Sequence, residues 1–109
     1  MEKIKSKLQK CEVEIIDYSK AIQLNPSDAN NYFSRGKAKS DLNQYEAAID
    51  DYSKAIQLNP SNANYYHYRG KAEYELNQCG LAINDYSKAI ELNPDRADYY
   101  AERRSAKYM

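Results

Sequence analysis

Few residues in this chain have the chemistry for catalysis or for metal binding. His67 is the only histidine, and Cys11 and Cys79 are the only cysteines. A metal site needs several converging ligands, and a catalytic base needs a nucleophile within reach. No cysteine or paired carboxylate stands at ligand spacing from His67, and the chain has no glycine-rich phosphate loop. We therefore expect no catalytic residue, no metal, no cofactor and no enzyme activity, and we expect His67 on a helix surface.

The charges of the chain are balanced. Lysine and arginine number 16 together, as do aspartate and glutamate, so the formal net charge is zero. A nucleic-acid-binding protein normally carries a basic excess that displaces counterions from phosphates. No segment is long and apolar enough to span a bilayer. We expect neither nucleic acid nor membrane insertion. The small number of cysteines makes no disulfide framework, which favours a reducing, cytoplasmic interior.

The sequence repeats itself with a fixed period. Asp17–Ser27 and Asp51–Ser61 are identical, and Asp85–Pro94 differs from the matching stretch by one Gln-to-Glu change. The prolines that close each unit follow one another at 34 residues: Pro26, Pro60 and Pro94. A fixed period of this length is the signature of a repeat architecture in which neighbouring units bury each other's apolar faces.

Each unit contains two amphipathic stretches. In the second stretch, Tyr45, Ala48, Ile49 and Tyr52 follow spacings of three and four, which place them on one face of a helix. An Asn-Gln pair separates the two stretches in each full unit, and asparagine tolerates the left-handed conformation that ends a helix. Each unit is therefore predicted to be a helix, a tight turn, a second helix and a turn at the proline.

A 34-residue helical hairpin with this punctuation resembles the tetratricopeptide repeat. The family pattern has an aromatic residue, a glycine, an alanine, a second aromatic, another alanine and a closing proline. The matching structural positions are Tyr32, Gly36, Ala48, Tyr52, Ala55 and Pro60 in one unit, and Tyr66, Gly70, Ala82, Tyr86, Ala89 and Pro94 in the next. The resemblance implies an all-α fold, a right-handed solenoid of stacked antiparallel hairpins. Glycine and alanine are expected where the helices of a hairpin approach most closely.

One departure from the family pattern recurs with the period. Arginine replaces a leucine of the pattern in each unit, at Arg35, Arg69 and Arg103. An aspartate recurs in the same way, at Asp17, Asp51 and Asp85. We expect these residues to form a ladder of ion pairs that adjusts the stack, and a functional arginine cluster is the alternative.

The register divides the single domain (1–109) into four parts. These are a clipped leading repeat (1–28), two full repeats (29–62 and 63–96) and a trailing first helix or capping helix (97–109), which makes about seven helices. The trailing helix has an apolar edge without a second helix to cover it. Three explanations remain open: a piece of a longer array, two chains that complete each other's ends, or a true cap marked by Arg104 in the place of the glycine.

The cysteines occupy equivalent places in units that stand two repeats apart. In a stacked array their α-carbons should lie beyond the ~7 Å limit for a disulfide. We expect both to be small core residues, and a redox-sensitive Cys79 at a helix start is the alternative.

The resemblance also implies a concave groove, lined by the first helix of each unit, that binds a partner protein or peptide. The predicted partner-binding residues are Asn30, Phe33, Ser34, Lys37, Asn64, His67, Tyr68 and Lys71. The lysines are expected to meet acidic side chains or a C-terminal carboxylate, or else to form a solvated face. The asparagines are expected to bind a ligand's backbone.

One subgroup of the family holds acidic chaperone tails through a two-carboxylate clamp. That clamp needs asparagine or arginine where this chain has Ser34, Tyr68 and Glu102. Only the lysines match the clamp, so clamp-type binding of a chaperone tail is not expected.

Three functions follow from these patterns. The first is a protein-interaction scaffold that holds an extended or helical segment of a partner in the groove. The second is a structural or self-associating repeat, natural or engineered, whose incomplete ends drive oligomerisation. The third is RNA binding of the kind seen in related 35-residue helical repeats, which the 34-residue period and the zero net charge disfavour.

Overall fold

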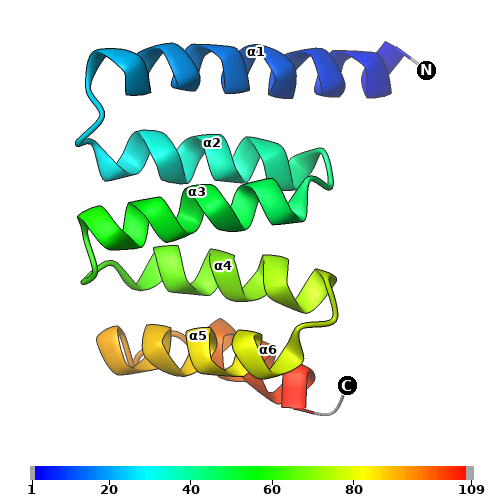
Figure 1. Cartoon of the computed structure of the whole chain (residues 1–109). Coiled ribbons are helices and arrows are strands. Elements are labelled where there is room, and N and C mark those ends of the chain that lie inside the picture. Colours follow the sequence, from blue (N-terminus) through cyan, green and yellow to red (C-terminus); the bar gives the residue numbers. More distant parts are fainter. Residues whose placement is uncertain (1, 108–109) are drawn as a thin grey trace.

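A computed structural model describes the backbone of residues 2–107 and the side chains of residues 7–107 (Figure 1). These residues form six helices and no strand: α1 (Glu2–Leu24), α2 (Ala29–Asp41), α3 (Tyr45–Leu58), α4 (Ala63–Glu75), α5 (Cys79–Leu92) and α6 (Ala97–Lys107). Each helix packs against the next one in the chain, and α4 also touches α2 and α6. Figure 1 shows α1 to α5 stacked in order, with α6 behind α5. The predicted all-α solenoid of helical hairpins is confirmed.

The tight turns inside the two full hairpins depend on asparagine. Asn43 and Asn77 have φ angles of 60° and 61°, in the left-handed region that a short polar side chain tolerates. In the first hairpin, the backbone N–H of Gln44 donates to the carbonyl oxygen of Lys39 over 2.9 Å. This bond closes the end of α2 and reverses the chain into α3.

The prediction of about seven helices is wrong by one, because α1 continues through the place of the first turn. Gln9 stands there in the position of Asn43 and Asn77. Glutamine is a better helix former than asparagine and enters the left-handed region less readily. The leading segment is therefore one helix of 23 residues and not a hairpin. Neither α1 nor any other helix in the described chain combines the length and the apolar character needed to cross a membrane.

Polar side chains start the first helix of each full unit. Asp28 Oδ1 accepts a hydrogen bond of 3.0 Å from the backbone N–H of Asn30, and Asn62 Oδ1 accepts one of 2.9 Å from that of Asn64. Each cap satisfies a helix N–H group that has no partner inside the helix. The caps fix where α2 and α4 begin after the preceding proline turn.

The small residues of the repeat lie where the helices of a hairpin meet. A Cβ atom built on Gly36 would lie 2.7 Å from Cε1 of Tyr52, and one on Gly70 would lie 2.7 Å from Cε1 of Tyr86. Both tyrosines are buried, as are the alanines of the pattern: Ala48, Ala55, Ala82 and Ala89. Tyr66 is buried as well, and its hydroxyl donates to the carbonyl oxygen of Pro60 over 3.0 Å. Tyrosine rings thus fill the space that the glycines leave.

The predicted ion pairs form in both full units. Arg35 Nε and Nη2 donate to the two carboxylate oxygens of Asp51 over 2.9 and 2.7 Å, and Nη1 donates to Ser19 Oγ over 3.1 Å. The next unit repeats all three contacts through Arg69, Asp85 and Ser53. Since the aspartates are only 4% and 6% exposed, these pairs are better sheltered than surface salt bridges. Each arginine joins its own hairpin to the second helix of the preceding unit.

Candidate functional site

Two clefts lie side by side across the first helices of the units. A cleft of about 210 Å³ opens between α2, α3 and α4, and one of about 240 Å³ opens between α4, α5 and α6. Lys71 and Glu75 of α4 line both clefts, so together they form one groove. The first cleft is lined by Lys37, Ser40, Asp41, Tyr45, Tyr52, Tyr68, Lys71, Ala72 and Glu75. The second is lined by Lys71, Tyr74, Glu75, Tyr86, Glu102 and Ser105.

The predicted partner-binding residues divide into two groups. Those that line the groove are Lys37, Tyr68 and Lys71. Those that line neither cleft are Asn30, Phe33, Ser34, Asn64 and His67. The reasons differ from residue to residue.

An aromatic–lysine cluster, made of Phe33, Lys37, Tyr68 and Lys71, stands at the edge of the first cleft. The ring of Phe33 packs edge-on against Tyr68, with centroids 5.2 Å apart. The ammonium groups of Lys37 and Lys71 each lie 5.1 Å from the centroid of Tyr68. Both lysines are exposed. Cation–π attraction contributes about 0.5–1 kcal/mol at exposed sites, which is enough to bias both ammonium groups toward this ring. Two positive charges are therefore held against the same aromatic ring.

Carboxylates accompany the lysines along the groove. Asp41 and Glu75 follow Lys37 and Lys71 by one helical turn, and both are exposed. The lysines and the carboxylates thus form two parallel rows of opposite charge. A ligand that binds here is oriented by both rows.

The predicted asparagines are already engaged within the protein. The hydroxyl of Tyr65 donates to Oδ1 of Asn30, and that of Tyr99 donates to Oδ1 of Asn64 over 2.9 Å. Both asparagines are exposed, and both tyrosines are buried. The side-chain amide N–H groups of both asparagines make no hydrogen bond to another described residue. Ser34 is half-buried on α2.

The prediction that His67 lies on a helix surface is wrong. Its ring is 5% exposed and packs against Tyr99, with centroids 4.7 Å apart. Nε2 forms a hydrogen bond with a carboxylate oxygen of Glu102, and Nδ1 is buried without a hydrogen-bond partner in the described chain. Burial lowers the pKa of His67, while the Glu102 carboxylate opposes this shift. His67 links α4 to α6 beneath the groove.

The partner of His67 was missed because it lies in a different unit. The offset of 35 residues between His67 and Glu102 recurs between Tyr65 and Asn30 and between Tyr99 and Asn64. Contacting residues on consecutive first helices are therefore separated by one repeat plus one residue. Applied to the sequence, this offset also finds the contact between Phe33 and Tyr68.

A buried carboxylate pair sits behind the second cleft. Glu73 takes the place of Lys39, whose Nζ lies 3.0 Å from Asp51 Oδ2 in the preceding unit. Glu73 is 5% exposed, its Oε1 atom has no partner among the described residues, and its nearest cation is Arg69 at 3.9 Å. Burial and the neighbouring Asp85 carboxylate raise the pKa of Glu73 to about 9. Folding therefore favours the protonated form of this side chain.

The cysteines and the metal-binding residue types form no cluster in the described part of the chain. Cys11 is buried in α1 and Cys79 is half-buried at the start of α5, and both thiols are free. Burial and nearby carboxylates raise the pKa of Cys11. Among the described residues, no group of three or more His, Cys, Asp and Glu side chains is arranged to hold a metal ion.

Family profiles match most of the chain. A profile described as TPR repeat matches residues 39–77 and 70–103, and one described as tetratricopeptide repeat matches residues 17–50. A comparison with curated proteins gave no significant match.

Solved structures of similar shape include peptide complexes. The first TPR of Spaghetti (RPAP3), bound to the HSP90 peptide SRMEEVD, is 27% identical with a TM-score of 0.89, over 92% of this chain and 79% of that chain. The second TPR domain of human RPAP3, in complex with the HSP70 peptide SGPTIEEVD, is 26% identical with a TM-score of 0.87, over 91% and 82%. MamA is 28% identical with a TM-score of 0.84, over 86% of this chain and 51% of that chain.

Proposed function

The chain belongs to the tetratricopeptide repeat family, and on this premise we propose that it is a protein-interaction scaffold whose groove holds an extended or helical segment of a partner. The observation that carries the proposal is the aromatic–lysine cluster, in which Lys37 and Lys71 each lie 5.1 Å from the ring of Tyr68. Two solved structures of similar shape hold peptides that end in Glu-Glu-Val-Asp, which supports a peptide ligand.

The chemistry of the groove indicates what the segment carries. An acidic side chain or a C-terminal carboxylate meets Lys37 and Lys71, and an apolar or aromatic side chain packs against Phe33 and Tyr68. The two-carboxylate clamp of some relatives is absent from the sequence pattern, because Ser34, Tyr68 and Glu102 replace its asparagines and arginines. Recognition then depends on the lysine row and on the aromatic contact together.

The proposed scaffold function has consequences for catalysis and for the cellular compartment. Domains with this family and fold are typically non-catalytic interaction modules, and we propose the same for this chain. The two free thiols support a reducing, cytoplasmic compartment.

A peptide titration tests the groove. We propose to record NMR spectra of the ¹⁵N-labelled chain while adding the peptide SGPTIEEVD. The comparison is a C-terminally amidated peptide in which Gln and Asn replace the acids. Shifts should cluster at Lys37, Tyr68 and Lys71 for the acidic peptide only. Shifts confined to the exposed outer residues of α3 and α5, such as Asp50 and Asn84, would remove the proposal.

Two double variants test the lysines of the groove. The control uses two lysines on the second helices that are also 34 residues apart. The double variant Lys37→Ala/Lys71→Ala should weaken acidic-peptide binding at least about tenfold, since each ammonium–carboxylate contact is lost. The control variant Lys54→Ala/Lys88→Ala removes the same charge from α3 and α5 and should leave affinity unchanged. Equal affinity losses in both double variants would indicate a general charge effect and would contradict a defined groove site.

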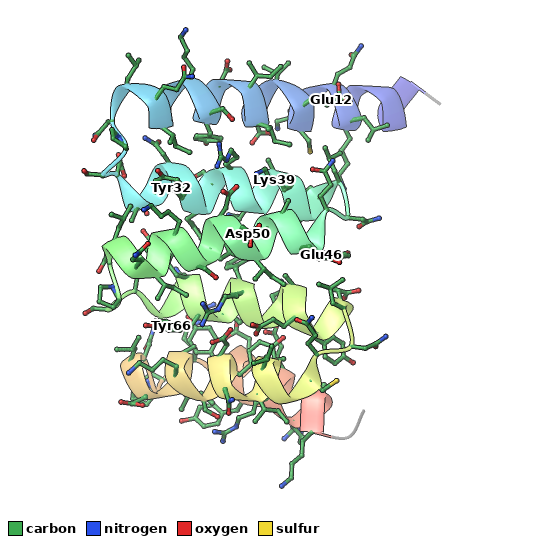
Figure 2. All side chains as sticks on the ribbon, viewed as in Figure 1. Glu12, Tyr32, Lys39, Glu46, Asp50 and Tyr66 are labelled. Atoms are coloured by element: carbon green, nitrogen blue, oxygen red, sulfur yellow. The ribbon has the colours of Figure 1, made fainter. Side chains whose placement is uncertain are left out.

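We propose self-association as a second function, on a separate observation at the two ends of the stack. Figure 2 shows side chains of α1 that point away from α2, where no described helix covers them. Val13, Ile16 and Leu24 of this helix are 54%, 66% and 80% exposed. At the other end, a hollow of about 560 Å³ is lined by Ile83, Ser87, Tyr100, Arg103, Arg104 and Lys107. Within the proposed domain (1–109), α1 then acts as the second helix of the clipped leading repeat and α6 as the trailing first helix.

A further inference from the structure

Arg103 of α6 is held in the same way as the arginines of the ion-pair ladder. Its Nη1 donates to Ser87 Oγ over 3.3 Å, and its guanidinium lies 5.7 Å from the ring centroid of Tyr100. Arg35 and Arg69 have the equivalent serine and tyrosine contacts, and each of them also binds an aspartate. Arg103 forms no ion pair with any residue that the structure describes. The arginine is therefore positioned for a carboxylate that this copy of the described chain does not supply.

Asp17 of α1 is a ladder aspartate that has no arginine partner in the described part of the chain. It occupies the register of Asp51 and Asp85, yet it is exposed, and it makes no ion pair within the described part of the chain. Arginine and aspartate of the ladder are 16 residues apart, so the partner of Arg103 falls at position 119. Position 119 corresponds to Asp17 when the sequence is shifted by three repeat periods of 34 residues. Asp17 of a second copy thus stands in register with Arg103.

We propose that α6 of one copy and α1 of the next form a helical hairpin in trans, so that copies of this chain associate head to tail. This inference rests on the self-association proposed above and names its surfaces. Arg103 of one copy pairs with Asp17 of the next, at the register positions of Arg35 and Asp51.

A second basic residue reaches the same carboxylate. Lys107 is in register with Lys39, whose Nζ lies 3.0 Å from Asp51 Oδ2. In the trans hairpin, Lys107 therefore approaches Asp17 together with Arg103. Asp17 receives the same two cations that the buried aspartate of the first full unit receives.

Exposed apolar residues at the two ends also match in register. Leu92 packs against the buried cluster that contains Tyr66, and the corresponding residues across the junction are Tyr100 of one copy and Leu24 of the next. Tyr100 is 39% exposed and Leu24 is 80% exposed. Their contact removes two of the large apolar side chains from water at once.

The close-approach residues differ at the junction, and the difference is complementary. Within the chain, Gly36 leaves room for a tyrosine ring and Ala48 is fully buried. Across the junction, Arg104 takes the glycine position and Glu14 takes the alanine position. The trans hairpin is therefore wider than the internal hairpins, and an Arg104–Glu14 pair bridges it. Association should be reversible and should weaken as salt is added, because much of it is ionic.

The geometry of such a contact predicts the assembly type. A head-to-tail junction uses two different surfaces, so it leaves one of each free on every oligomer and builds open chains or rings. A two-fold dimer that uses a single end of the stack would instead pair α1 with α1 or α6 with α6. The mass should therefore grow with concentration beyond that of a dimer.

Sedimentation of the full chain over a concentration series, in low and in high salt, tests the inference. Asp17→Ala and Arg103→Ala should each weaken association at least about tenfold. The matched controls Asp50→Ala and Arg96→Ala change exposed residues of the same types and should leave association unchanged. Circular dichroism of each variant checks that the helices remain.

Mixing the two variants gives the sharpest result. The Asp17→Ala chain keeps Arg103, and the Arg103→Ala chain keeps Asp17, so a single junction forms and growth stops at a one-to-one dimer. Neither variant alone should form it. Association that survives both substitutions, or a closed dimer of the unaltered chain, overturns the trans hairpin while leaving self-association standing. A chain that is monomeric at every concentration overturns both.

Discussion

Replacing Glu73 by lysine should stabilise the protein. Glu73 is buried at a position where the preceding unit has Lys39, and Lys39 lies 3.0 Å from Asp51. One oxygen of Glu73 has no hydrogen-bond partner in the described chain, and Asp85 stands beside it with a second carboxylate. Leaving a buried polar group unsatisfied costs about 1–3 kcal/mol. The variant Glu73→Lys removes this cost and restores the cation of the repeat, so the free energy of unfolding should rise by about that amount.

The same site predicts how stability depends on pH. The pKa of Glu73 is raised from 4.5 to about 9 in the folded chain, so folding favours the protonated form. The contribution of this group is fully present below its unfolded pKa and is lost as the pH rises through about 9. Between pH 5 and 8 the unaltered chain should lose stability relative to Glu73→Gln, at no more than about 1.4 kcal/mol per pH unit.

Urea denaturation followed by circular dichroism at pH 5 and at pH 8 measures both effects. Glu75→Gln is the control, because Glu75 is an exposed glutamate on the same helix. Two results would refute the reasoning. One is a constant difference between the unaltered chain and Glu73→Gln across this pH range. The other is a Glu73→Lys variant that is less stable than the unaltered chain at pH 8.

The remaining predictions concern packing and the ladder. Gly36→Ala should lower the free energy of unfolding by about 1–3 kcal/mol, because its Cβ would lie 2.7 Å from the Tyr52 ring. Gly80→Ala is the matched control: no atom lies within 4 Å of its Cβ, so it should stabilise α5 by about 0.5–1 kcal/mol. Arg69→Ala should cost about 3–5 kcal/mol in urea denaturation, since it removes the only cation that the described residues place against the buried Asp85. A loss below about 1 kcal/mol would mean that the pair behaves as a surface salt bridge.

The fold was predictable from the sequence wherever a residue type decides the backbone. The period, the asparagine turns and the caps each depend on a local preference, and the hairpins α2–α3 and α4–α5 followed from them. The error at the first turn has the same origin. Gln9 stands in register with Asn43 and Asn77, but the register does not say whether a residue can adopt the turn conformation.

The groove was less predictable, because burial there depends on the next unit. His67 looks like a surface residue when its own helix is considered, and α6 covers it with Glu102. Asn30 looks like a ligand donor, and the hydroxyl of Tyr65 from the following unit binds its oxygen. Both contacts join residues 35 positions apart, and a pattern confined to one helix cannot contain them.

The stack separates the residues that hold it together from those that vary. Each second helix between two first helices is packed on both sides, and its later part barely changes: Asp51–Pro60 and Asp85–Pro94 differ at one position, whereas Tyr45–Asp50 and Cys79–Asn84 differ at four. In the first helices, Phe33 is replaced by His67 and Ser34 by Tyr68. The ladder arginines keep the same contacts in both units despite these changes. Because the ladder contacts do not depend on these variable positions, side chains there can change without a change of fold.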